Sequence, residues 1–119
     1  MSRHLQREKV MTIIYQQAIR GGSYFDYLED NGAEDYMLDL LKDIHFNKNS
    51  YIDKLNQKLN KWKFERLGNI EQAILLIAVS EYLNFEIPKA VTINEAITLA
   101  KKYADEESYK LINATLDKL

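Results

Sequence analysis

The chain has 119 residues, enough for one folding unit with a hydrophobic core and too few for two large domains. It contains no cysteine, which excludes disulfide bonds, thiolate metal ligands and cysteine nucleophiles, and its net charge of -2 argues against a uniformly basic nucleic-acid-binding protein. Its 46% hydrophobic and 29% charged residues are typical of an ordered globular protein, and one proline and four glycines favour helices over short strands. We therefore predict an all-α fold in a single domain over residues 1–119.

The sequence gives no sign of a membrane-spanning or exported protein. The longest apolar run, residues 73–79, is far shorter than a membrane span, and the first ten residues lack the apolar segment of a secretory signal. We expect a cytoplasmic protein with no membrane contact.

In the N-terminal half, the first helix is predicted over residues 3–20, because Gly21-Gly22 is a strong stop signal. Ser23 is expected to cap a short segment that ends at the turn Asn31-Gly32. Helical periodicity returns over residues 34–46. Asn49 or Ser50 is then expected to cap a separate helix whose apolar stripe is formed by Ile52, Leu55 and Leu59.

In the C-terminal half, residues 69–83 are apolar on nearly every side, which predicts a helix in the centre of the domain. After Pro88, Thr92 and Glu95 fit a capping box, so the next helix is expected to begin at Thr92. A final helix is predicted from about Glu106 to Leu119. Six or so helices with short connections indicate a compact bundle, or two small bundles that share helix 69–83.

Charge is unevenly distributed along the chain. Residues 1–20 carry four Lys or Arg against one Glu, residues 26–43 carry seven carboxylates against one lysine, and residues 44–66 carry six cations against two carboxylates. This segregation allows a local basic surface on an acidic protein, which is the form that a phosphate-binding patch takes. On charge alone, solvated helix faces explain the pattern equally well.

Four residues are candidates for nucleic-acid contacts. Arg3 and Arg7 lie one turn apart and extend the core stripe of the first helix, so they would be held where phosphates approach, unless they are merely solvated. Tyr15 and Tyr103 suit stacking on unpaired bases, although in a chain with eight tyrosines any one of them is more often a core or boundary residue. We find no nucleophile beside a base, no metal-ligand spacing and no phosphate loop, so no enzymatic activity, metal or cofactor is predicted.

From Leu67 to its C-terminus, the chain resembles the C-terminal half of the NusB family. The resemblance is carried by residues 67–81, by the pattern P-x-x-V-x-I-N-E-A-I-x-L-A-K that starts at Pro88, and by S-x-K-x-x-N-x-x-L over residues 108–116. Near the N-terminus, Arg3, Arg7-Glu8 and Ile14-Tyr15-Gln16 are similar to the basic first helix of the family. Residues 21–60 match only in spacing.

The resemblance implies a fold of two perpendicular three-helix bundles and a role as a non-enzymatic transcription antitermination factor. NusB proteins pair with ribosomal protein NusE and bind the boxA element of nascent RNA, and so help the transcribing RNA polymerase complex to read through terminators, notably in ribosomal RNA operons. Carried onto this sequence, the resemblance implies an RNA surface formed by Arg3, Arg7, Tyr15, Tyr103, Glu107, Lys110 and Leu111. It implies a NusE surface on helix 69–83 formed by Glu71, Leu75 and Glu81.

Several positions depart from the family pattern. His4, Leu5 and Gln6 stand where the family has a denser arginine cluster, which predicts a smaller electrostatic share of RNA affinity. Leu111 replaces an aromatic residue and removes a stacking platform. The alternatives left open are a NusB-like accessory domain of a ribosomal RNA methyltransferase and a protein-interaction module with weak RNA binding. Association into a homodimer is also left open.

Overall fold

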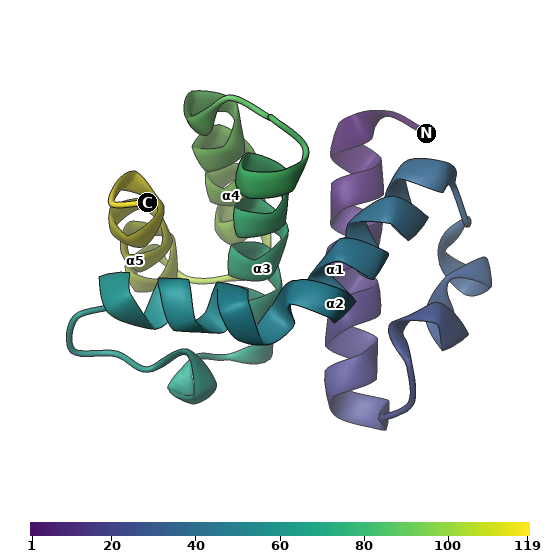
Figure 1. Ribbon diagram of the computed structural model, residues 1–119, viewed down its shortest axis with the longest axis horizontal. Helices are drawn as coiled ribbons and strands as arrows, with labels where there is room; N and C mark the ends of the chain where they lie inside the picture. The colour runs from purple at the N-terminus through teal and green to yellow at the C-terminus, as the bar shows by residue number, and fades with distance from the viewer.

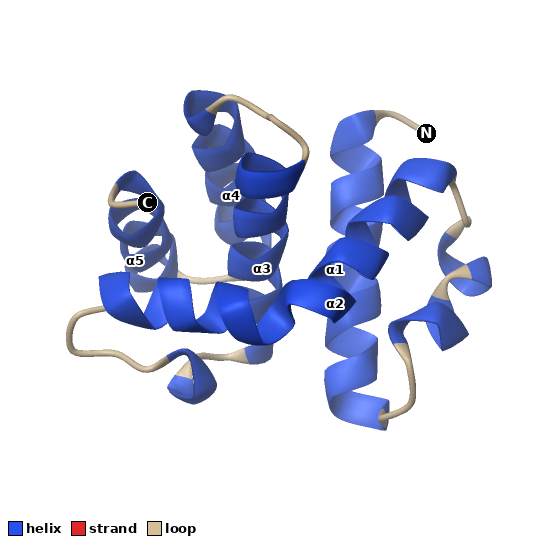
Figure 2. Ribbon diagram, in the orientation of Figure 1, coloured by secondary structure: helices blue, strands red, loops and turns tan.

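The computed structural model describes residues 1–119, which form only helices (Figure 1; Figure 2). The five α-helices are α1 (Arg3–Arg20), α2 (Asp35–Lys58), α3 (Asn69–Asn84), α4 (Lys89–Tyr103) and α5 (Glu106–Asp117). Three short 3-10 helices are η1 (Tyr24–Tyr27), η2 (Glu29–Asn31) and η3 (Phe64–Arg66). The predicted all-α fold is confirmed. None of the helices combines the length and apolar composition needed to cross a membrane.

The helices form two groups that are joined by α2 (Figure 1). One group consists of α1, η1, η2 and the first half of α2, and the other consists of the second half of α2 with α3, α4 and α5. The apolar helix α3 contacts α1, α2, α4 and α5, and it is buried from Ala73 to Glu81. The prediction that this helix is shared at the centre is therefore confirmed.

The predicted boundaries of the first helix are also confirmed. Ser2 caps α1 by accepting a hydrogen bond from the Leu5 amide at 3.1 Å. The helix ends at Gly21, whose φ of 80° is a left-handed value that a side chain disfavours. Ser23 caps η1, as its position after the two glycines predicted.

The two helices predicted over residues 34–59 are in fact one helix, α2. The polar residues in its middle do not break it, because the buried carboxylate of Asp43 ties them together. This carboxylate accepts hydrogen bonds from the Asn47 amide at 2.8 Å, the Tyr51 hydroxyl at 2.6 Å and the Ser80 hydroxyl at 2.5 Å. Tertiary contacts therefore override the local preference for a cap at Asn49 or Ser50.

The predicted start of the penultimate helix is wrong by one turn. α4 begins at Lys89, with Pro88 at the N-cap position, and the Thr92 amide already donates to the Pro88 carbonyl at 3.0 Å. Thr92 is buried inside the helix, so it does not form a capping box with Glu95. The Glu95 carboxylate instead accepts from His4 on α1 at 2.8 Å. Pro88 disfavours helical geometry at the preceding residue, Ile87, so α4 does not extend further toward the N-terminus.

Candidate functional site

Arg7 lies inside the protein and joins α1 to α3. Its Nε donates to both carboxylate oxygens of Glu81, at 2.7 and 2.8 Å, and the Tyr36 hydroxyl donates to the same carboxylate. Arg7 is 5% exposed and Glu81 is 1% exposed. Each side chain is covered and already paired with the other, so neither Arg7 nor Glu81 has the exposure that its predicted contact with RNA or with a partner needs.

The surroundings of this buried pair keep its charges in place. Burial acts to lower the pKa of Arg7, but the hydrogen bonds and charge of Glu81 outweigh it and raise that pKa. Burial and the neighbouring Glu81 carboxylate also raise the pKa of the Tyr36 hydroxyl above its ordinary range. Tyr36 thus remains protonated, and its hydroxyl donates to the Glu81 carboxylate.

Arg3 occupies a different position from Arg7. Its guanidinium carbon lies 3.6 Å from the centre of the Tyr36 ring, in a cation–π contact on the surface of the protein. The side chain is exposed, so one face of the guanidinium stays open to a phosphate. Of the two arginines predicted to contact RNA, only Arg3 has the exposure that this role needs.

Exposed aromatic rings lie on α1 and at the end of α4. Tyr15 and Tyr103 are both exposed, as an RNA-contacting role requires. The Tyr103 hydroxyl donates to the Glu8 carboxylate, which Lys102 also approaches at 3.0 Å. These contacts hold Tyr103 against α1 and at the same time balance the charge of Lys102. The Tyr103 ring is therefore held in place by Glu8, and the charges of Glu8 and Lys102 beside it offset each other.

Because of Glu8, the stability that these contacts contribute to the fold depends on pH. Hydrogen bonds from Tyr103 and Lys102 lower the pKa of Glu8 from its ordinary value of about 4.5. Its ionised form therefore stabilises the fold above that value, and this contribution is lost as the pH falls through the lower folded-state pKa. The variant Glu8→Gln has no carboxylate to titrate. We expect the difference in unfolding free energy between wild type and variant, measured by urea titration, to shrink on acidification; a constant difference would contradict the contacts described.

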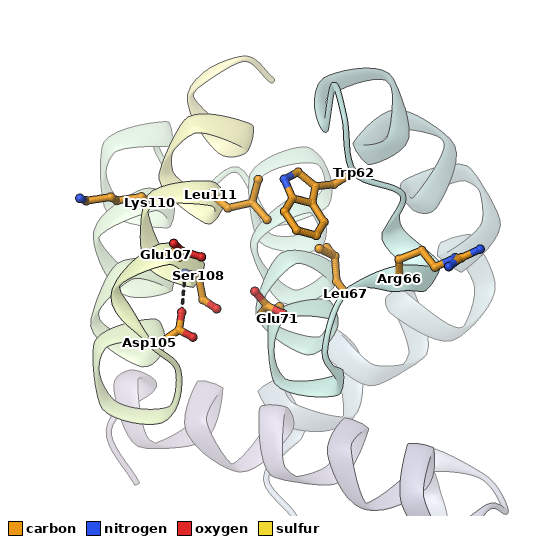
Figure 3. Close-up of a pocket in the computed structure, with 9 residues that line it drawn as sticks. All are labelled: Trp62, Arg66, Leu67, Glu71, Asp105, Glu107, Ser108, Lys110 and Leu111. Carbon is orange, nitrogen blue, oxygen red and sulfur yellow. Dashed lines mark hydrogen bonds between the residues drawn. The ribbon is translucent and has the colours of Figure 1, made fainter.

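A cavity of about 430 Å³ opens between α5 and the connection that leads from α2 to α3 (Figure 3). It brings together four of the predicted site residues with five others; the lining residues are Trp62, Arg66, Leu67, Glu71, Asp105, Glu107, Ser108, Lys110 and Leu111. The charge of Lys110 is partly balanced by Glu106, 3.0 Å away on the same helix. Arg3, Arg7, Tyr15 and Tyr103 do not line this cavity, so the predicted site residues fall into separate groups rather than one cationic groove.

The predicted partner surface is reduced to one residue. Leu75 is 0% exposed and packs in the core, so it lacks the exposure that its predicted partner contact needs. Glu71 lies in the first turn of α3, where its carboxylate accepts from the Gly68 amide at 2.8 Å and faces the cavity (Figure 3). Of the three residues predicted to meet a partner, only Glu71 is accessible.

Trp62 and Arg66 were missed by sequence reasoning. Both lie in the connection between α2 and α3, outside the α-helices to which periodicity directs attention. A signal was nevertheless present, because Trp62 is the only tryptophan of the chain and stands between Lys61 and Lys63. An aromatic residue between two cations in a loop is a pattern that suits nucleic acid.

The two joined helical groups, with exposed aromatic and cationic side chains around an open cavity, define a small all-helical binding domain. The chain belongs to the NusB family, which it matches over residues 4–119. It is 33% identical over 135 residues to the transcription antitermination protein NusB of Natranaerobius thermophilus, covering 100% of this chain and 94% of the relative. It is 37% identical over 127 residues to the NusB protein of Bacillus cereus strain B4264, covering 100% and 97%.

Solved structures agree with this assignment. The structure of T. maritima NusB superposes with a TM-score of 0.92 at 29% identity, covering 99% of this chain and 89% of that one. A structure of the antitermination factors NusB and NusE in complex with dsRNA has a matching chain with a TM-score of 0.78 at 22% identity, covering 98% and 93%. The latter shows a shared fold. The fold that the sequence resemblance implied is thereby confirmed.

Proposed function

We propose that this protein is a transcription antitermination factor that binds boxA-type RNA together with ribosomal protein NusE and supports read-through of ribosomal RNA operons. Membership of the NusB family over nearly the whole chain carries this proposal. A solved complex of the same fold contains both NusE and RNA. The proposed role involves no catalytic step and no cofactor, and it places the protein in the cytoplasm with the transcribing RNA polymerase complex.

The accessible groups on α1 and α4 support an RNA contact of modest charge. Tyr15 and Tyr103 offer exposed rings for unpaired bases, and Arg3 offers an open guanidinium. Lys102 and Arg7 are paired with carboxylates and contribute less to phosphate binding. At this contact, stacking should therefore supply a larger share of the affinity than charge.

The acidic edge of the cavity supports a contact with a basic protein. Glu71 stands there beside Asp105 and Glu107, and all three carboxylates line the same cavity (Figure 3). Complementary charge favours association with a basic ribosomal protein and speeds encounter. We therefore assign the NusE contact to Glu71 and Asp105, which lie below Trp62 and Leu111 in Figure 3.

The direct test is an RNA titration with and without purified NusE. Fluorescence anisotropy of labelled boxA RNA should show tighter binding than a scrambled RNA of equal length, and NusE should tighten it further. If NusE leaves the affinity unchanged and the scrambled RNA binds equally well, the proposed function is wrong.

Tyr103 provides a residue-level prediction. Replacing it with alanine removes the ring, and we expect RNA binding to weaken by about 1–3 kcal/mol, the usual contribution of one stacked base. The variant Tyr103→Phe keeps the ring and loses only the hydroxyl that contacts Glu8, so it should bind nearly as wild type does. Phe46, an exposed aromatic residue on α2, serves as a control: Phe46→Ala should leave RNA affinity unchanged. Equal losses for Tyr103→Ala and Tyr103→Phe would argue against stacking.

A further inference from the structure

The connection between α2 and α3 holds a large aromatic side chain out of the core. Trp62 is 53% exposed, whereas Phe64 and Leu67 in the same connection are buried. The backbone around Trp62 is fixed: its amide donates to the Leu59 carbonyl at 3.0 Å, and the Phe64 amide donates to the Asn56 side chain at 2.8 Å. An indole held open on an anchored backbone is preorganised to receive a flat ligand.

Cations surround this indole, and none of them forms an ion pair. We call the set the Trp62 surface; it consists of Lys58, Lys61, Trp62, Lys63, Arg66 and Lys118. The ion pairs of the protein involve cations elsewhere, at the N-terminus, His4, Arg7, Lys102 and Lys110. Five cations without an ion pair therefore gather around one indole, whereas Arg3, Lys9, Arg20, Lys89 and Lys101, which also lack an ion pair, stand at separate positions along α1 and α4. Such a local concentration of positive charge attracts anions.

Three neighbouring hollows share Trp62 as a wall. One is the cavity of about 430 Å³ already described, in which the indole and the Leu111 side chain point toward each other (Figure 3). A second, of about 220 Å³, lies between Leu111 and the lysines at positions 58, 61 and 118. The third, of about 490 Å³, is lined by Trp62 with Lys61, Lys63 and Arg66. The second and third hollows thus place apolar surface next to unpaired cations, whereas the first also carries the carboxylates of Glu71, Asp105 and Glu107.

We propose that the Trp62 surface binds an unpaired nucleotide of RNA, with the base stacked on the indole beside Leu111 and the flanking phosphates on Lys61, Lys63 and Arg66. An exposed ring beside a cationic track is the combination that holds single-stranded nucleic acid. The surplus of unpaired cations favours a polyanion over a basic protein. This inference rests on the proposed function and gives it a second RNA contact, separate from Tyr103.

Trp62 reports on its own occupancy, because its emission is the only tryptophan signal of the chain. Titrating a short single-stranded boxA-type RNA into the full chain should quench that emission along the same saturation curve as the anisotropy of labelled RNA. The variant Trp62→Ala should bind RNA about 5–150-fold more weakly, which corresponds to the loss of one stacked base. Trp62→Phe keeps an aromatic face and should retain most of the affinity, and Phe46→Ala should match wild type.

The phosphate contacts have a separate readout. The double variant Lys61→Ala, Lys63→Ala should reduce the slope of log affinity against log salt by about 1.4, or about 0.7 for each phosphate contact to a single strand. Lys54→Ala is the matched control, because Lys54 is exposed on α2 and lines none of the three hollows, so it should leave the slope unchanged. Equal slopes for wild type and the double variant would contradict the phosphate contacts.

The other outcomes separate this inference from the proposed function. If RNA binds without quenching Trp62, and Trp62→Ala binds it as wild type does, the Trp62 contact is wrong and the proposed function stands. If Trp62→Ala weakens NusE binding alone, the surface is a protein contact and the inference is likewise wrong. If wild type binds no RNA with or without NusE, both fail. Thermal unfolding of each variant checks that it is folded.

Discussion

Replacing Arg7 with alanine is expected to lower the free energy of unfolding by about 3–5 kcal/mol, the usual cost of breaking a buried ion pair. The variant leaves the Glu81 carboxylate buried with only the Tyr36 hydroxyl as a donor, and a buried charge without its counter-ion is strongly destabilising. Urea denaturation of the purified variant measures the loss. Such a loss is a large fraction of the stability of an ordinary domain.

Two variants show whether the ion pair is the cause. Arg3→Ala removes an exposed arginine one turn away and should lower stability by only about 0.5–1 kcal/mol, the usual contribution of an exposed cation–π contact. The double variant Arg7→Met, Glu81→Met removes both charges and should be less destabilised than Arg7→Ala, because no unpaired charge remains. If Arg7→Ala unfolds at the same urea concentration as Arg3→Ala, the Arg7–Glu81 pair does not stabilise the fold as predicted.

Replacing Leu75 with alanine should cost about 2–5 kcal/mol of unfolding free energy, as large-to-small substitutions in a packed core do. Leu75 is fully buried in the central helix α3, which contacts all four other α-helices, so the surrounding side chains have little freedom to close the cavity. Thermal or urea unfolding measures the effect. The folded variant should still bind NusE as wild type does, because its surface is unchanged.

Glu71→Gln is the matched variant on the same helix. Glutamine can still accept the hydrogen bond from the Gly68 amide, so stability should be nearly unchanged, while loss of the charge should weaken NusE binding. Leu75→Ala and Glu71→Gln thus separate a core residue from a surface residue one helical turn away. A Leu75→Ala protein of wild-type stability with impaired NusE binding would restore Leu75 to the partner surface.

The elements of the fold that local chemistry determines could be predicted from the sequence. Gly21 and Gly22 end α1, Asp105 caps α5 by accepting from the Ser108 amide at 2.8 Å, and the continuous apolar pattern of α3 predicts its central position. The continuity of α2 could not be predicted, because it depends on a hydrogen bond from Ser80, 37 residues away, to Asp43. The local polar residues favoured a break at Asn49 or Ser50, whereas the long-range contact to Asp43 favours one continuous helix.

The candidate site was predictable only where exposure follows from position on a helix. Tyr15 and Tyr103 are exposed as their proposed role requires, whereas Arg7 points inward. Periodicity placed Arg7 on the core stripe but could not show whether it overhung the core or entered it, since its partner Glu81 lies 74 residues away. The exposure of Trp62 beside the cavity could not be predicted, because hydrophobic periodicity gives no orientation for side chains outside regular helices.

The unbroken α2 also sets a distance. Tyr36, whose ring contacts Arg3, lies in the first turn of α2. The connection that contains Trp62 begins where α2 ends. The 24 residues of α2, at about 1.5 Å each, act as a ruler of up to about 36 Å between the two ends. A strand of RNA that contacts both Arg3 and Trp62 must be long enough to bridge that span. The protein therefore discriminates between RNA ligands by length, and a shorter fragment contacts one end alone.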